Sequence, residues 1–223
     1  MTLILGRKRG MTQLFAEDGT VTGVTVVEVG PCTVTQIRTV ETDGYDAVQL
    51  GFGDIKDKHA AKPQLGHFKK NGVAPKRFLR EERLMKPATQ KVGDTVLATV
   101  FNVGDLVDVT GTMKGRGYAG TIKRHGFSRG PETHGCMNVR QPGSLASKRI
   151  GKVIKGKRLG GHYGATRETS KNLIVMRVDQ ERNLLYLKGS VAGPNTGYIQ
   201  VRTARTGVKK VGPAVTPGKG KKA

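Results

Sequence analysis

The sequence predicts a mainly β protein, a barrel or a sandwich, interrupted by one long irregular stretch. Short runs of Val, Ile, Thr and Leu recur along the chain with Gly, Pro, Asn and Asp between them, which is typical of strands joined by turns. These runs stop between residues 111 and 172, where 13 glycines stand in a segment with little strand pattern. Hydrophobic residues make up 36% of the chain and Trp is absent, so we expect a modest core of Val, Leu and Ile.

Eight short segments have the composition of strands. Gly30 and Pro31 end the first of them, and residues 179–183 are expected to form a hairpin loop between two others. The best candidate for a helix is Phe78–Met85, which is short and amphipathic and ends before Pro87. The predicted strands are Val24–Val29, Thr33–Val40, Ala47–Leu50, Thr95–Phe101, Leu106–Val109, Leu173–Val178, Leu184–Leu187 and Tyr198–Val201.

The order of these segments predicts four parts. Residues 1–110 form the first part of a barrel, with a partly helical insertion near 56–90, and residues 173–205 supply the strands that complete it. Residues 111–172 are then an insertion into the barrel rather than a linker. A stretch so rich in glycine cannot bury enough apolar surface to pack on itself, so it is either disordered or held by a partner. Residues 206–223 are expected to be a flexible basic tail.

Positive charge is concentrated in the insertion. The chain holds 39 Lys and Arg against 17 Asp and Glu, a net charge of +22 and a pI near 10.4. Residues 1–110 have a net charge of only +2, whereas residues 111–172 hold 14 basic and 2 acidic residues. A polyanion is the natural complement of such a surface. A membrane is a poorer partner, because the basic stretch has no sustained apolar face and no apolar run approaches about 20 residues.

Folded RNA is the polyanion that fits the insertion best. Arginine binds phosphates through two N–H groups and stacks on bases, lysine neutralises phosphates at longer range, and glycine lets the backbone lie close to RNA. The scarcity of aromatic residues argues against a stacking platform for single strands. The predicted RNA-binding residues are Lys114, Arg116, Lys123, Arg124, His125, Arg129, His134, Arg140, Lys148, Arg149, Lys152, Lys155, Lys157, Arg158, His162 and Arg167.

Two glycine-rich motifs resemble nucleotide-binding loops without meeting their requirements. Gly115–Gly120 matches GxGxxG, but it lacks the βαβ unit and the acidic residue about 20 positions further on that a dinucleotide site needs. Gly151–Arg158 resembles a phosphate-binding loop whose final Ser or Thr, the magnesium ligand, is replaced by Arg158. The sequence therefore predicts no cofactor and no small-molecule substrate.

Metal and catalytic sites are also not indicated. His134 and Cys136 lack the spacing of zinc ligands and stand among positive charges that disfavour a dication. Glu132 and Glu168 are the only acidic residues between 111 and 172, too few for acid–base pairs there. We therefore expect no metal and no enzymatic activity. Cys136 and Cys32, the only other cysteine, are expected to be reduced thiols in a cytoplasmic protein.

The longest distinctive segment is Thr110–Phe127, with the sequence TGTMKGRGYAGTIKRHGF. Further distinctive segments are Gly6–Phe15, Asp43–Gly53, Gly66–Phe68, Arg140–Ser144, Gly151–Arg158, Gly161–Gly164, Asn172–Leu173, Val178–Leu185 and Lys188–Pro194. In this order they resemble the ribosomal protein L3 (L-three) family of the large subunit, in its bacterial or organellar form. The resemblance runs from about residue 4 to 202.

This resemblance implies a translation-factor-type β-barrel with a long irregular extension rich in Gly and Arg. It also implies binding to the large-subunit ribosomal RNA, contacts with neighbouring large-subunit proteins, a role in early subunit assembly, and a location in the cytoplasmic ribosome. The central loop would extend towards the peptidyl-transferase centre, whose chemistry belongs to the RNA. The loop-tip residues would be Gln141, Pro142, Gly143, Ser144 and Ser147.

One position departs from the family's pattern. Some bacterial members carry a methylated Gln where this chain has Ser147, so that modification is not expected here. Two other classes remain as alternatives. A DNA-compacting protein would explain the charge and would prefer duplex DNA, whereas a nucleotide-dependent oxidoreductase would rest on GxGxxG alone and would bind its cofactor.

Overall fold

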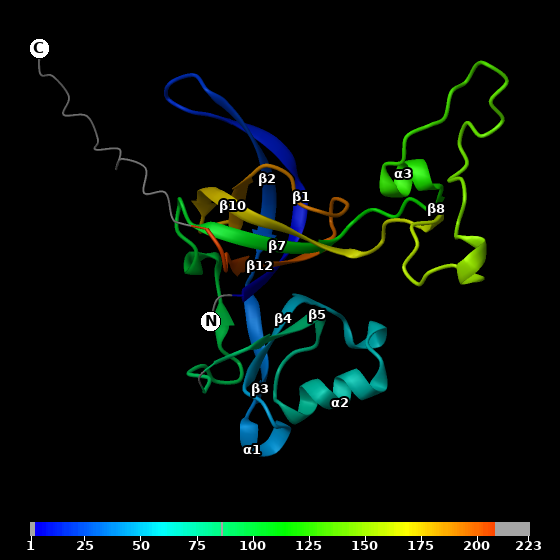
Figure 1. Ribbon diagram of the computed structural model, residues 1–223. Coiled ribbons are helices and arrows are strands. Elements are labelled where there is room, and N and C mark those ends of the chain that lie inside the picture. Colours follow the sequence, from blue (N-terminus) through cyan, green and yellow to red (C-terminus); the bar gives the residue numbers. More distant parts are fainter. Residues whose placement is uncertain (1–2, 86, 208–223) are drawn as a thin grey trace, which may run out of the picture. The chain divides into compact units, whose positions relative to one another are not determined.

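The computed structural model describes residues 3–85 and 87–207 and is mainly β (Figure 1). Six antiparallel strands close into a barrel in the order β1-β12-β7-β10-β11-β2. The predicted mainly β class is confirmed, as a barrel rather than a sandwich. The barrel strands are β1 (Leu3–Phe15), β2 (Val21–Val29), β7 (Leu106–Thr112), β10 (Arg167–Asp179), β11 (Leu184–Lys188) and β12 (Tyr198–Thr203).

A second antiparallel sheet of four strands, in the order β5-β4-β3-β6, is formed by the chain between β2 and β7. It contains β3 (Cys32–Arg38), β4 (Ala47–Asp54), β5 (Lys76–Arg83) and β6 (Thr95–Val96). Three short helical segments lie between these strands, and a fourth follows β6. They are α1 (Val40–Asp43), η1 (Asp57–His59), α2 (Lys62–Lys70) and, after β6, η2 (Ala98–Val100).

Strand β1 is absent from the predicted set, although it pairs with both β2 and β12 in the barrel. Its charged run, Arg7 to Arg9, hides the strand pattern. Lys8 is nevertheless buried, and its Nζ donates hydrogen bonds to the carbonyls of Val191 (2.7 Å) and Gly193 (3.4 Å). A buried ammonium needs such acceptors, and they come from a segment more than 180 residues away.

The predicted helix Phe78–Met85 is wrong, because residues 78–83 lie in β5 and pair with β4, and the strand ends before Leu84. The mixture of apolar and charged residues in this short segment is compatible with an amphipathic helix and also with a strand. Glu82 is buried, and its Oε2 accepts the backbone N–H of Leu3 at 3.2 Å. The ring of Phe78 stacks on that of Tyr198, with centroids 4.9 Å apart. These long-range contacts outweigh the local preference for a helix.

Several strand boundaries also differ from the prediction. The predicted strand Thr33–Val40 is too long, because β3 ends at Arg38 and Val40 begins α1. Two other differences are larger. Only Thr95 and Val96 of the predicted strand Thr95–Phe101 pair with β3, and the chain then turns into η2. Strand β10 begins at Arg167 rather than Leu173, because its first residues pair with β7. The predicted hairpin loop at 179–183 is confirmed between β10 and β11. Most of the predicted flexible tail, residues 208–223, lies outside the described residues.

The core is built on Val, Leu and Ile, as predicted. Leu5, Val27, Val109, Leu185 and Ile199 are buried in the barrel and belong to the same cluster as the buried residues of the four-stranded sheet. Burying an aliphatic side chain of this size contributes about 1.5–3 kcal/mol.

The thiol of Cys32 is part of this core. Its Sγ lies 3.2 Å from the carbonyl oxygen and 3.4 Å from the backbone nitrogen of Leu5. Burial raises the pKa of the Cys32 thiol to about 11, so it stays protonated and unreactive at neutral pH.

The chain divides into two compact units. Unit 1 comprises the residues up to Thr112 and from Arg167 onward, and it contains the barrel and the four-stranded sheet. Unit 2 is Met113–Thr166.

Candidate nucleic-acid interface

The first and last segments of unit 2 pair with each other and form a two-stranded ribbon. The backbone N–H of Arg116 donates to the carbonyl of Tyr163 at 2.8 Å, and the N–H of Tyr163 donates to Gly117 at 2.9 Å. Strands β8 (Tyr118–Ala119) and β9 (Gly161–His162) continue the ribbon. Gly164 is required here, because its φ is +81° and a Cβ would lie 2.3 Å from the Lys114 carbonyl oxygen.

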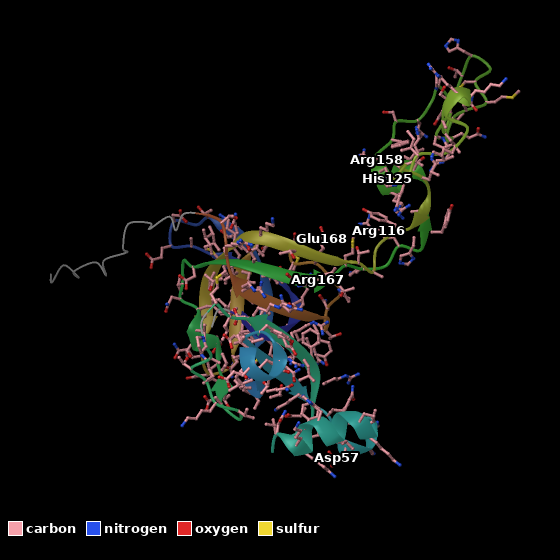
Figure 2. All side chains as sticks on the ribbon, turned by 60° about the horizontal axis from the view of Figure 1, so that its bottom comes forward. Asp57, Arg116, His125, Arg158, Arg167 and Glu168 are labelled. Carbon is pink, nitrogen blue, oxygen red and sulfur yellow. The ribbon has the colours of Figure 1, made fainter. Side chains whose placement is uncertain are left out.

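Helix α3 (Thr121–His125) follows the ribbon and is tied to the returning chain. Gly126, with a φ of +69°, ends the helix in the left-handed conformation that favours glycine. Arg124 Nη1 donates to the carbonyl of Leu159 at 2.8 Å, and His125 Nε2 lies 3.0 Å from the same oxygen. Figure 2 labels His125 and Arg158, which lie on the outgoing and the returning segment where the two meet at Leu159. The contact closes the loop of residues 126–158 at its base.

The loop itself has little regular structure. The N–H of Gly130 donates to the carbonyl of Val139 at 2.9 Å, which closes a small turn. Farther along, η3 (Lys148–Ile150) is a single short turn that ends at Gly151 in the left-handed conformation. Among the residues of unit 2 whose burial is described, few are buried: Ala119, Thr121 and Gly164. Most side chains of unit 2 are therefore exposed or only partly buried.

Nearly all the predicted RNA-binding residues of unit 2 are exposed. Arg124 and His125 are the exceptions, because both are half-buried against Leu159. Arg167 lies outside unit 2, on barrel strand β10 (Figure 2). The exposed residues are Lys114, Arg116, Lys123, Arg129, His134, Arg140, Lys148, Arg149, Lys152, Lys155, Lys157, Arg158 and His162.

The predicted loop-tip residues are exposed as well. They are Gln141, Pro142, Gly143, Ser144 and Ser147. The hydroxyl of Ser144 donates to the carbonyl of Ala146 at 3.2 Å, and Gly143 has a φ of +77°. The tip is thus a compact turn of small residues.

Nearly all the charged side chains of unit 2 are positive. It contains twelve Lys and Arg residues and one acidic residue, Glu132, which forms an ion pair with Arg129. The guanidinium of Arg116 lies over the ring of Tyr163, 5.1 Å from its centroid, which holds it at the ribbon. The arrangement suits binding of many phosphates, because the one acidic side chain of unit 2 is already paired with Arg129.

The predicted nucleic-acid contacts all lie within residues 111–172 and include one residue of the barrel wall, Arg167, but none on β12. Arg202 and Arg205 are exposed there, at and just after the end of β12. The net charge of +8 in residues 173–223 was the available signal.

Two further findings concern the part of the chain that the structure describes. Within it, no group of three or more His, Cys, Asp or Glu side chains is placed to hold a metal ion. None of its helices has the length and apolar character needed to span a membrane.

Comparison with known proteins gives consistent matches. The family model described as ribosomal protein L3 matches residues 82–184. A large ribosomal subunit protein uL3 from Pelotomaculum thermopropionicum is 52% identical over 201 residues, which cover 90% of this chain and 96% of that protein. The uL3 proteins of Crocosphaera subtropica and Geobacillus kaustophilus are each 50% identical, over 91% and 93% of this chain and 96% and 97% of their own lengths.

Proposed function

Because the chain belongs to the ribosomal protein L3 family, we propose that it is a structural protein of the large ribosomal subunit whose unit 2 binds large-subunit ribosomal RNA. Its other partners would be neighbouring large-subunit proteins, and its place would be the cytoplasmic ribosome. Its role would be to support early assembly of the subunit and to orient RNA, without catalysing a reaction.

The observation that carries this proposal is the combination of charge and exposure in unit 2. Twelve basic residues accompany one acidic residue that is already paired with Arg129. Nearly all of these cations are exposed on a segment with a very small interior. Phosphate contacts of this kind dominate the affinity of proteins for nucleic acids.

Binding can be followed directly at Cys136. This thiol is half-buried in unit 2, whereas Cys32 is buried in the core of unit 1, on strand β3. We expect a maleimide to label one thiol, Cys136, in the folded free protein, and large-subunit rRNA to slow that labelling at least about tenfold. Liquid chromatography and mass spectrometry would measure both rates. Duplex DNA of equal phosphate concentration is the control, and equal protection by DNA would favour the DNA-compacting alternative.

The loop tip, residues 141–149, is proposed to extend towards the peptidyl-transferase centre. This expectation comes from the family resemblance, and the exposed small residues Gly143, Ser144 and Ser147 suit close approach to RNA backbone. Arg140, Lys148 and Arg149 flank or end the tip. The alternative is a tip that only adds positive charge as an anchor.

Deleting residues 141–149 separates these roles. Unit 2 keeps its ribbon and the contact with Leu159, so we expect the variant still to enter large subunits. We expect slower peptide-bond formation, or altered sensitivity to drugs that act at that centre, measured by rapid-quench kinetics on purified ribosomes. Replacing Lys152 and Lys155 by Gln is the control, because it removes as many charges as the deletion and leaves the tip intact. Normal rates and normal drug responses in the deletion variant would reduce the tip to an anchor.

A further inference from the structure

A row of uncharged polar side chains crosses three strands of the barrel wall. Gln200 on β12 lies opposite Thr110 on β7, and Thr110 lies opposite Thr169 on β10. The two threonine Oγ1 atoms are 2.8 Å apart. The neighbouring Val109 and Val201 are fully buried, so this row faces away from the core, as alternation along a strand requires.

Three arginines surround this row. Arg167 precedes Thr169 by two residues on β10, and its Nη2 lies 3.5 Å from Oε1 of Gln200. Arg202 and Arg205 lie at the end of β12 and just beyond it. All three are exposed, and within the described residues none forms an ion pair with an acidic side chain. Their charges are therefore available to a ligand.

These side chains line a cavity of about 460 Å³. The acidic residue in its lining is Asp108, whose carboxylate accepts hydrogen bonds from two backbone N–H groups. Its Oδ1 accepts the backbone N–H of Asn172 at 2.9 Å, and its Oδ2 accepts that of Arg205 at 3.4 Å. Asn172 lies where the pairing of β10 with β7 shifts register, so Asp108 joins this bulge to the chain after β12.

The chemistry of the lining distinguishes between classes of ligand. An arginine guanidinium binds phosphate oxygens through two N–H groups. Hydroxyl and amide groups can donate hydrogen bonds to a ribose 2′-hydroxyl and accept them from it. A protein partner would be expected to meet an apolar or aromatic centre. None of the large exposed apolar side chains of the described chain lines this cavity.

We propose that the outer face of β12, β7 and β10 is a second RNA-binding surface, which holds the sugar–phosphate backbone of large-subunit rRNA through Arg167, Arg202 and Arg205. The uncharged row of Thr110, Thr169 and Gln200 recognises the ribose. This proposal rests on the proposed function, in that it takes the same RNA as the partner, but it adds a site on unit 1.

The test measures affinity for transcribed large-subunit rRNA over a range of salt concentrations, with the full chain. Replacing the three arginines by Gln removes about three phosphate contacts, so the slope of log affinity against log salt should become shallower by about 2–3, and affinity should fall about tenfold or more. Replacing them by Lys should keep the slope. Thermal melting checks that each variant is folded.

The matched control removes three exposed charges elsewhere on unit 1: Lys58, Lys62 and Arg182, each replaced by Gln. Its slope should change by less than about 0.5. If the arginine variant behaves like this control while Gln substitutions at Lys152 and Lys155 still weaken binding, the barrel surface is refuted and the proposed function stands. If neither set of substitutions matters, the proposed function itself fails.

A second variant tests recognition of the ribose. Thr110→Val with Thr169→Val removes both hydroxyls and keeps β-branched side chains suited to strands. We expect affinity for RNA to fall about three- to tenfold, with no change for single-stranded DNA of the same sequence. Equal loss for both nucleic acids would refute ribose recognition. Competition by polyglutamate that depends on the three arginines would instead assign the surface to an acidic protein segment.

Discussion

Raising the salt concentration from 50 to 200 mM should weaken binding of the intact protein to large-subunit rRNA by about 10⁴- to 10⁵-fold. Of the twelve basic residues in unit 2, Arg129 is paired with Glu132, and Arg124 donates to the Leu159 carbonyl. Ten cations of unit 2 therefore remain for phosphates. Each contact releases counterions, so ten contacts predict a slope of log affinity against log salt of about −7 to −9.

Filter binding or fluorescence anisotropy across a salt series would measure this slope. Replacing Lys152, Lys155 and Lys157 by Gln should make it shallower by about 2–3, because all three are exposed. Replacing Arg129 by Gln should change the slope by less than the loss of one phosphate contact would, because Glu132 already neutralises Arg129. A slope shallower than about −3 in the unmodified protein would mean that the contacts are not mainly electrostatic.

Replacing Gly164 by Ala should open the ribbon at the base of unit 2. The new Cβ would lie 2.3 Å from the Lys114 carbonyl oxygen and 2.9 Å from the Arg116 nitrogen. Both atoms belong to the backbone, so the clash is removed only if the two paired segments of the ribbon move apart. We expect a cost of about 1 kcal/mol for the left-handed conformation and about 2 kcal/mol more for the clash.

Hydrogen exchange at the Arg116 amide would report this opening, because its N–H donates to Tyr163 across the ribbon. A loss of about 2 kcal/mol corresponds to exchange about 30 times faster than in the control. Gly126→Ala is the matched control: its φ is also positive, +69°, but no atom lies within 4 Å of the added Cβ. Equal exchange rates in the two variants would show that the close approach at Gly164 is tolerated.

Local pattern was sufficient wherever a strand is formed from β-branched residues with glycine or proline beside it. Val24–Val29 and Tyr198–Val201 are predicted from their β-branched composition between turn residues, and they lie in β2 and β12. The predictions failed where charged residues occupy buried strand positions. Lys8 in β1 and Glu82 in β5 are stabilised by backbone groups far away in sequence, which no local window contains.

The candidate site shows the same division. The charge density of the insertion was evident from composition, and nearly all of its predicted contact residues are exposed in the structure. Which cations are already engaged was not evident. Arg124 and His125 share the carbonyl of Leu159, which is 35 and 34 residues away, and that partner is in place only when the loop closes.

By itself, the sequence determined the mainly β class, the position of the glycine-rich insertion and the concentration of positive charge within it. These properties follow from composition and short-range alternation, which are local. Only the tertiary structure decided that the barrel closes through β1, and that Thr110, Thr169 and Gln200 form one row among three arginines. Strand pairing brings together residues 59 and 90 positions from Thr110, and pairing register is a property of the whole barrel rather than of any one segment.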